Sequence, residues 1–265
     1  MNLPLVLKTC VTAARTVGEL LRREQHARKR VNEATQHDIK LELDVRSQRL
    51  IEKMLKARFP NVAFLGEEGT TGKMDAPYRW VVDPIDGTVN FAYGIPHVCV
   101  SIALQGRAPS AKESDFEDGY QTLAGVVYDP FLDEMWTAVR GKPARLNDRI
   151  IHVSQRRKLN ESIVSIGFAK SLESLEHTLP YFIDLVHRVR KIRMMGSAAL
   201  ALTYVACGRF DAYIERGISL WDVAAGGLIL ECAGGEFWHQ EITGDYKYRM
   251  IASNGRLRRC LRVPK

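Results

Sequence analysis

The sequence lacks the features that define disulfide-rich, zinc-binding, membrane-spanning and dinucleotide-binding proteins. Its five cysteines are an odd number at wide spacing and form no C-x-x-C pair, so we expect buried free thiols. No apolar run approaches the length that a helix needs to cross a bilayer. No G-x-G-x-x-G motif follows an expected strand. Internal repeats and low-complexity linkers are also absent.

The chain starts with an amphipathic segment rather than a secretory signal. Residues 5–28 carry apolar side chains at spacings of three and four, which predicts a long helix. We therefore expect a cytoplasmic protein that has no membrane partner. The length of 265 residues, with 46% hydrophobic and 26% charged residues, suits one globular unit spanning 1–265. Sub-lobes at 1–155 and 156–265 are compatible with the pattern.

Basic residues exceed acidic ones, and the formal net charge is +7. Much of the excess lies in Leu20–Arg30 and Arg256–Lys265. Solvated helix faces and a solvated tail explain most such runs. Attraction of an anionic substrate and contact with nucleic acid are the functional alternatives. No known nucleic-acid-binding motif accompanies the two segments, so contact with nucleic acid is the weaker alternative.

Helical and strand patterns interleave along the chain, and the middle of the sequence is a series of strands. A polar stretch at 106–122 has the composition of an extended hairpin tip. This order predicts a layered α+β fold with sheets between helices. Further helices are expected over 43–60, 172–190, 196–208, 219–235 and 254–262. Strands are expected over 62–68, 79–83, 97–105, 123–130, 134–141, 162–167, 191–195, 209–215 and 248–253.

Acidic side chains stand at the ends of several expected elements. Each has an ordinary structural explanation by itself, such as a helix start or a solvated turn. Together they form a set of hard oxygen ligands, which suits Mg²⁺, and two such ions can hold the attacking and leaving oxygens of a phosphoryl transfer. The acids are Glu67 and Glu68, Asp83 and Asp86, Asp222, and Asp38 with Asp44.

The segment around Asp83 and Asp86 carries most of this hypothesis. A buried strand, Trp80–Val82, delivers the two carboxylates three residues apart. Two like charges that close repel each other and resist burial, so a cation between them is expected. Gly87 leaves room for close approach, and the backbone amides of Gly87 and Thr88 can bind an anion. D-P-I-D-G-T therefore predicts metal ligands joined to a phosphate cradle.

These segments resemble the inositol monophosphatase family, within the lithium-sensitive, Mg²⁺-dependent phosphatases. The resemblance rests on GEE at 66–68, WVVDPIDGTVNF at 80–91, GSAALALTYVACGRFDAYIE at 196–215 and WDVAAGGLILECAGG at 221–235. SNGRL near the end matches as well. The matching segments occur in the family's order and span nearly the whole chain. It implies an α/β/α/β/α layered sandwich that hydrolyses phosphomonoesters with metal-activated water.

The resemblance also implies a metal-ligand set. Glu67 is similar to the ligand of the first metal that helps to orient the water, and Asp83 to the ligand that bridges two metals. The carbonyl of Ile85 is similar to another ligand of the first metal. Asp86 and Asp222 are similar to ligands of the second metal. Two or three Mg²⁺ ions are implied, with Glu68 serving the third, and Mn²⁺ is an alternative.

The remaining implied roles concern catalysis and substrate. Thr88 is similar to the residue that assists the water, and Asp44 to the acid that positions Thr88. Glu215 is similar to the acid that accepts a hydrogen bond from a substrate hydroxyl. The implied substrate contacts are Asp86, Gly87, Thr88, Gly196, Ser197, Ala198, Glu215 and Asp222.

The sequence departs from the family pattern in one loop. Family members carry a lysine shortly before the position of Asp38, where this chain offers only Lys29 and Arg30. Metal affinity and lithium sensitivity are therefore open. The expected activity is hydrolysis of a polyol or sugar phosphate, first of all inositol 1-phosphate, by a homodimer. Alternatives are fructose 1,6-bisphosphate, histidinol phosphate or a nucleotide as substrate, and an RNA- or transcription-complex-binding regulatory role.

Overall fold

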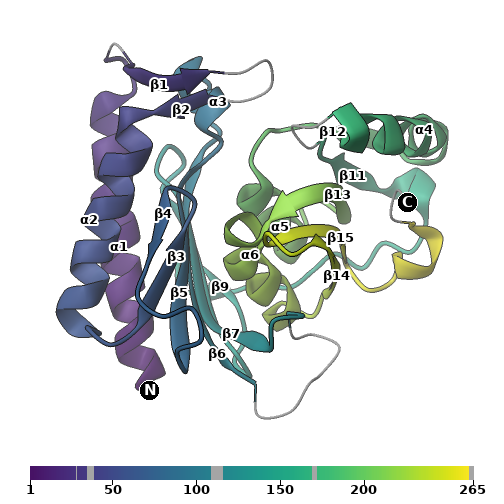
Figure 1. Cartoon of the computed structure of the whole chain (residues 1–265). Helices are drawn as coiled ribbons and strands as arrows, with labels where there is room; N and C mark the ends of the chain where they lie inside the picture. The colour runs from purple at the N-terminus through teal and green to yellow at the C-terminus, as the bar shows by residue number, and fades with distance from the viewer. Residues whose placement is uncertain (28, 35–38, 109–115, 169–171, 263–265) are drawn as a thin grey trace.

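The computed structural model describes residues 1–27, 29–34, 39–108, 116–168 and 172–262, with the side chains of 172–174 excepted. The described chain forms five layers in which helices alternate with two sheets (Figure 1). The α-helices are α1 (Leu3–Glu24), α2 (Glu42–Arg58), α3 (Thr88–Ala92), α4 (Leu172–Arg188), α5 (Ala198–Ala206) and α6 (Leu220–Cys232). Short 3-10 turns lie at Leu159–Glu161 and Arg258–Cys260.

The larger sheet has eight strands in the order β10-β9-β8-β7-β6-β5-β3-β4, and only the β3–β5 pair is parallel among its described pairings. Its strands are β3 (Ala63–Gly66), β4 (Gly69–Thr71), β5 (Tyr78–Asp86), β6 (Cys99–Arg107), β7 (Tyr120–Asp129), β8 (Glu134–Val139), β9 (Arg145–Leu146) and β10 (Arg149–Ile150). Sequential antiparallel neighbours from β5 to β10 form the expected meander. Helices α1 and α2 cover its outer face.

The smaller sheet has five strands in the order β12-β11-β13-β15-β14 and lies between the α5–α6 layer and α4 (Figure 1). Its strands are β11 (Ile163–Ile166), β12 (Lys191–Arg193), β13 (Ala212–Ser219), β14 (Glu236–Thr243) and β15 (Lys247–Ser253). A separate ribbon pairs β1 (Val31–Ala34) with β2 (Ile39–Leu41). The expected α/β/α/β/α sandwich is confirmed. The sub-lobe division near residue 155 stays a prediction, although each of the two larger sheets falls on one side of it.

Strand β5 is buried on both faces, which explains its run of apolar residues. Successive side chains of a strand point to opposite faces. Trp80 and Val82 join the core under α1 and α2, whereas Val81 joins the core under α5 and α6. All three are at most 1% exposed. This double burial holds the carboxyl end of β5 between two helical layers.

Small residues bring α6 close to its neighbours. A Cβ atom on Gly226 would lie 2.7 Å from the Leu202 side chain of α5, and one on Gly125 of β7 would lie 3.0 Å from Ala225 O. Gly226 and Gly125 therefore allow α6 to pack closely against α5 and β7. The helix ends at Cys232, Ala233 is its C-cap, and Gly234 follows with φ +87°.

Several expected elements differ from the observed ones. The strand expected to end at Asp83 continues to Asp86, with an irregular register against β6 between them. The helix expected over 254–262 is wrong, because the segment forms only one short 3-10 turn. Its Leu257 and Leu261 are buried four residues apart, which imitates helical periodicity. The Asn254 side chain accepts from Arg256 N and Leu257 N, and forms a turn there instead.

The polar stretch 106–122 joins β6 to β7 as the expected hairpin connection, of which residues 109–115 lie outside the described part. Among the described residues, no helix is long and apolar enough to cross a membrane. The described parts of the two basic segments lie on different sides of the molecule, one at the end of α1 and the other beside α4 (Figure 1).

Candidate active site

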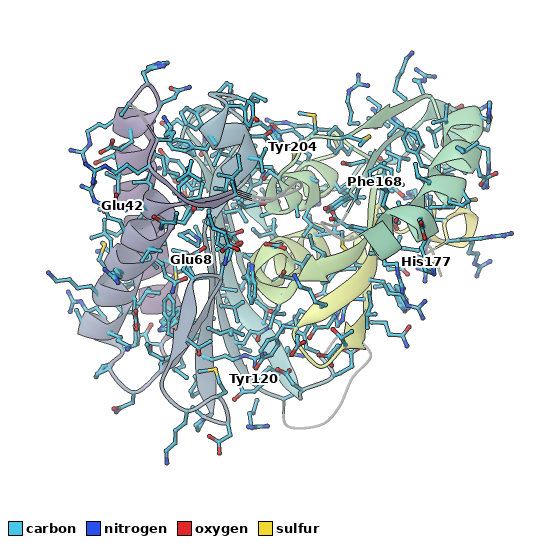
Figure 2. All side chains as sticks on the ribbon, turned by 45° about the horizontal axis from the view of Figure 1, so that its top comes forward. Glu42, Glu68, Tyr120, Phe168, His177 and Tyr204 are labelled. Atoms are coloured by element: carbon cyan, nitrogen blue, oxygen red, sulfur yellow. The ribbon has the colours of Figure 1, made fainter. Side chains whose placement is uncertain are left out.

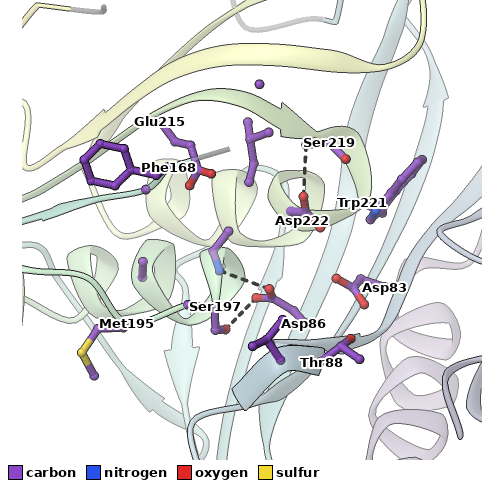
Figure 3. A pocket seen from close by; sticks show the side chains of 18 of the residues that line it. Asp83, Asp86, Thr88, Phe168, Met195, Ser197, Glu215, Ser219, Trp221 and Asp222 are labelled. Carbon is purple, nitrogen blue, oxygen red and sulfur yellow. Dashed lines mark hydrogen bonds between the residues drawn. The ribbon is translucent and has the colours of Figure 1, made fainter. Parts of the chain in front are cut away.

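A cavity of about 1020 Å³ opens where the carboxyl end of β5 meets the first turns of α5 and α6. Asp83, Asp86 and Asp222 meet in this cavity (Figure 3). One carboxylate oxygen from each lies within 4.8 Å of the other two. The structure therefore brings together acids from segments more than 130 residues apart in sequence.

Asp83 and Asp86 are buried, at 2% and 7% exposed. Burial raises the pKa of Asp83, and repulsion from Glu67, Asp86 and Asp222 raises it further. Burial and then repulsion from Asp222 raise the pKa of Asp86 to about 6. Within the described chain, neither Asp83 nor Asp86 forms a salt bridge. A cation bound between them would favour the ionised forms, and three clustered carboxylates form a donor set that suits Mg²⁺.

The start of α5 fixes the orientation of Asp86. Its Oδ2 accepts from Ser197 Oγ at 2.6 Å and from Ala199 N at 2.7 Å, and its Oδ1 accepts from Ala198 N at 3.2 Å. These bonds oppose the rise in the pKa of Asp86. The partial positive charge at a helix start also favours a carboxylate there. Ser197 and Ala198, predicted as substrate contacts, therefore line the cavity while binding Asp86.

Asp222 and Glu67 complete the acidic wall. Asp222 lies in the first turn of α6, where its Oδ2 accepts from Ser219 N at 3.0 Å. Glu67 follows β3, and its amide donates to Val82 O of β5 at 3.1 Å. Both residues line the cavity. Glu68 does not, and its amide instead donates to Oε1 of the buried Gln48 at 2.9 Å, on the side of α2 (Figure 2).

Gly87 and Thr88 turn the chain from β5 into α3. Gly87 has φ +103°, and a Cβ atom there would lie 2.9 Å from His97 O. The Thr88 hydroxyl lies within hydrogen-bond distance of Ile85 O, at 2.9 Å, and of Asp44 Oδ1, at 3.4 Å. The structure thus brings Asp44, Ile85 and Thr88 together as the resemblance implied, and their catalytic and metal-binding roles stay predictions.

Lys29, the lysine of the loop that departs from the family pattern, lies away from the acidic cavity. Lys29 Nζ donates to Glu24 O at 2.7 Å, at the end of α1, and lies 4.6 Å from the Phe91 ring centroid. Lys29 does not line the cavity. Asp38 lies outside the described residues. Neither residue therefore adds a described contact to the acidic cluster.

The opposite wall of the cavity contains predicted and missed residues. Gly196 and Glu215 line it as predicted. The sequence reasoning missed Lys40, Phe168, Met195, Tyr213 and Lys247. Tyr213 had a detectable signal, because it precedes Glu215 by two residues on a strand and so shares its face. The others lie in the short strand β2, in loops and at the start of β15, and their position depends on tertiary packing.

Three comparisons place the chain among known proteins. The sequence profile described as the Inositol monophosphatase family matches residues 2–258. A Xylella fastidiosa protein named Nus factor SuhB is 42% identical over 232 residues, covering 85% of this chain and 78% of that protein. An inositol monophosphatase of Mesembryanthemum crystallinum is 39% identical over 245 residues, covering 88% and 86%.

Solved structures agree with the sequence relatives. The extragenic suppressor protein suhB of Bartonella henselae superposes with a TM-score of 0.85 at 34% identity, covering 97% of this chain and 96% of that one. An inositol monophosphatase from Anabaena superposes with a TM-score of 0.82 at 34% identity, covering 97% of this chain and 93% of that one. Fold, acidic cavity and relatives together define a phosphoric monoester hydrolase acting on inositol phosphates as a class. The chain belongs to the inositol monophosphatase family.

Proposed function

We propose that this protein hydrolyses the phosphate monoester of a polyol, with inositol 1-phosphate as its first candidate substrate, in a reaction that requires Mg²⁺. The observation that carries the proposal is the cluster of Asp83, Asp86 and Asp222, buried and within 4.8 Å of one another. Glu67 and the carbonyl of Ile85 line the same cavity and complete the proposed ligand set. Magnesium bound there would neutralise charge on the phosphoryl group and lower the pKa of a bound water.

The side chains around the cluster have distinct proposed tasks. Glu67 and Thr88 would accept hydrogen bonds from the attacking water and orient it toward phosphorus. Thr88 is held for this by Ile85 O and Asp44. The amides of Gly87 and Thr88 would donate to phosphoryl oxygens. Such preorganised donors are a large source of transition-state stabilisation.

The leaving group would lie toward the small-sheet side of the cavity. Asp222 would hold the water that protonates the leaving alkoxide, and Glu215 would accept from a hydroxyl of the polyol. Gly196, Ser197 and Ala198 would form the adjoining floor, since all three line the cavity. This assignment also accommodates a sugar phosphate, so fructose 1,6-bisphosphate, histidinol phosphate and a nucleotide belong in the substrate panel.

Phosphate release from inositol 1-phosphate tests the proposal. Wild-type protein should be active with Mg²⁺, inactive after chelation by EDTA and active again when Mg²⁺ is restored; Mn²⁺ and Li⁺ are assayed beside it. Asp83→Asn should retain less than about one tenth of the activity. Asp75→Asn is the matched control, because Asp75 is exposed and lies outside the cavity. Activity that survives chelation would reject the mechanism.

Size-exclusion chromatography tests the proposed homodimer.

A second candidate function has support of its own. Relatives from Xylella fastidiosa and Pseudomonas aeruginosa are named Nus factor SuhB, which suggests a partner in transcription. This chain exposes Arg256, Arg259 and Arg262 beside α4, where the Arg188 guanidinium donates to Cys260 O at 3.3 Å. Several arginines on one surface suit contact with nucleic-acid phosphates.

RNA binding measured at about 50 and 200 mM salt tests this candidate, since binding through several phosphate contacts weakens steeply over that range. Arg259→Glu with Arg262→Glu should abolish the binding. Arg49→Glu with Arg58→Glu is the control, because those exposed arginines lie on α2, outside both basic segments. Absence of salt-sensitive binding would remove this candidate.

A further inference from the structure

The Glu215 carboxylate is confined from two sides. The Tyr213 hydroxyl donates a hydrogen bond to Glu215 Oε2, and both residues come from β13. Both are buried, Tyr213 at 3% and Glu215 at 8% exposed. Figure 3 shows the Glu215 side chain reaching into the cavity beside Phe168. Tyr213 therefore holds one carboxylate oxygen of Glu215 from within the same strand.

Gly167 confines the same carboxylate from the neighbouring strand. It follows β11, which pairs in parallel with β13, and its amide donates to Ile214 O at 3.0 Å. A Cβ atom on Gly167 would lie 1.7 Å from Glu215 Oε2 and 2.2 Å from Glu215 Cδ. Any larger residue at 167 must therefore displace the carboxylate.

The Tyr213 hydroxyl serves as a permanent donor. Burial, and then the charge of Glu215, raise the pKa of Tyr213 well above its ordinary value, so the phenol keeps its proton at neutral pH. An ionised carboxylate offers about four acceptor sites and no donor. The bond from Tyr213 occupies one of these sites, and the carboxylate that it holds lines the cavity.

We propose that Tyr213 is a positioning residue which, together with Gly167, fixes Glu215 so that the pocket selects phosphate esters whose leaving group carries a free hydroxyl. The inference rests on the proposed phosphatase function and adds a determinant of its substrate class. Tyr213 acts through Glu215 and not on the phosphate. Its loss should therefore lower activity on esters whose leaving group carries a hydroxyl. Hydrolysis of esters that lack such a hydroxyl should stay nearly unchanged.

Two substrates separate these effects. Inositol 1-phosphate carries hydroxyls on its leaving group, and p-nitrophenyl phosphate carries none. Tyr213→Phe should lower kcat/KM for inositol 1-phosphate about tenfold, mostly through KM, because a hydrogen bond to a charged group is lost. It should change p-nitrophenyl phosphate hydrolysis by less than about twofold. Tyr248→Phe is the matched control, because that buried hydroxyl has no hydrogen-bond partner among the described residues.

Two further variants make the test specific. Gly167→Ala should give the same substrate-selective loss while Tyr213 stays intact. In a Glu215→Ala background, Tyr213→Phe should cause no additional loss, because contacting residues that act as a unit are not additive. Equal losses on both substrates, no loss on either, or full additivity with Glu215→Ala would overturn the positioning role. A wild-type protein that hydrolyses neither ester in Mg²⁺ would overturn the proposed function, and this inference with it.

Discussion

The Ser197 hydroxyl donates a 2.6 Å hydrogen bond to Asp86 Oδ2, although the two residues stand 111 positions apart in the chain. The bond joins the end of β5 to the start of α5, and two amides of α5 support it. Because Asp86 is a proposed metal ligand, the start of α5 sets both the direction and the charge state of that ligand.

Removal of this hydroxyl should weaken metal binding. The Ser197 bond lowers the pKa of Asp86, so Ser197→Ala should raise that pKa and move the acid limb of the pH–activity profile to higher pH. The Mg²⁺ concentration for half-maximal activity should rise about 10- to 100-fold. Ser165→Ala is the control, because Ser165 lines the same cavity but donates to Arg193 O. An unchanged Mg²⁺ requirement would contradict the prediction.

The metal-free protein should lose stability as the pH rises. The pKa of Asp86 is about 6 in the fold and about 3.9 in the unfolded chain. Between these values the folded state binds a proton that the unfolded state has lost, so the free energy of unfolding falls with increasing pH. For Asp86 the loss approaches about 3 kcal/mol by pH 7, and the raised pKa of Asp83 acts in the same direction.

Thermal melts at pH 5 and pH 7.5 check this linkage. Mg²⁺ should raise Tm more at pH 7.5, where the carboxylates are ionised and their repulsion is relieved by the cation. The double variant Asp83→Asn, Asp86→Asn should lose most of this difference. Equal Mg²⁺-induced shifts at both pH values in the wild type would show that these acids do not carry the effect.

Gly87 should tolerate no side chain. Its φ of +103° disfavours L-residues, and a Cβ atom would lie 2.9 Å from His97 O and 3.3 Å from Gly196 O. Gly87→Ala should destabilise the fold by roughly 1–3 kcal/mol and displace Thr88, with loss of activity. Gly94→Ala is the control for backbone strain alone, since Gly94 has φ +75° and open space around it. Equal effects in urea denaturation would exclude a role for the contact.

The packing of α6 should depend on the absence of a side chain at 226. A Cβ atom on Gly226 would lie 2.7 Å from Leu202 Cβ, so Gly226→Ala should separate α5 from α6. Overpacking of this kind costs about 1–3 kcal/mol of unfolding free energy. Gly244→Ala should be nearly neutral, because nothing lies within 4 Å of that position. Chemical denaturation of the two variants compares them directly.

The sequence predicted a helix or strand correctly where the residues of that element carry the apolar pattern of their own burial. Trp80–Val82 are apolar because β5 is buried on both faces, and the strand was recognised from that run. Strand β14 was missed, because its mixed composition gains order from pairing with β15 at the sheet edge. The helix expected over 254–262 failed because two buried leucines reproduced a helical spacing within a turn.

The sequence alone determined which acids stand near the ends of elements, because its apolar run leads into Asp83 and Asp86 and its helical pattern starts just before Asp222. It also carried the family resemblance that assigned the phosphatase class. Only the tertiary structure decided that Ser197 binds Asp86 and that Gly167 and Tyr213 confine Glu215. Those contacts depend on how α5, α6 and two sheets pack against each other, and hydrophobic packing between distant segments leaves no short-range pattern in the chain.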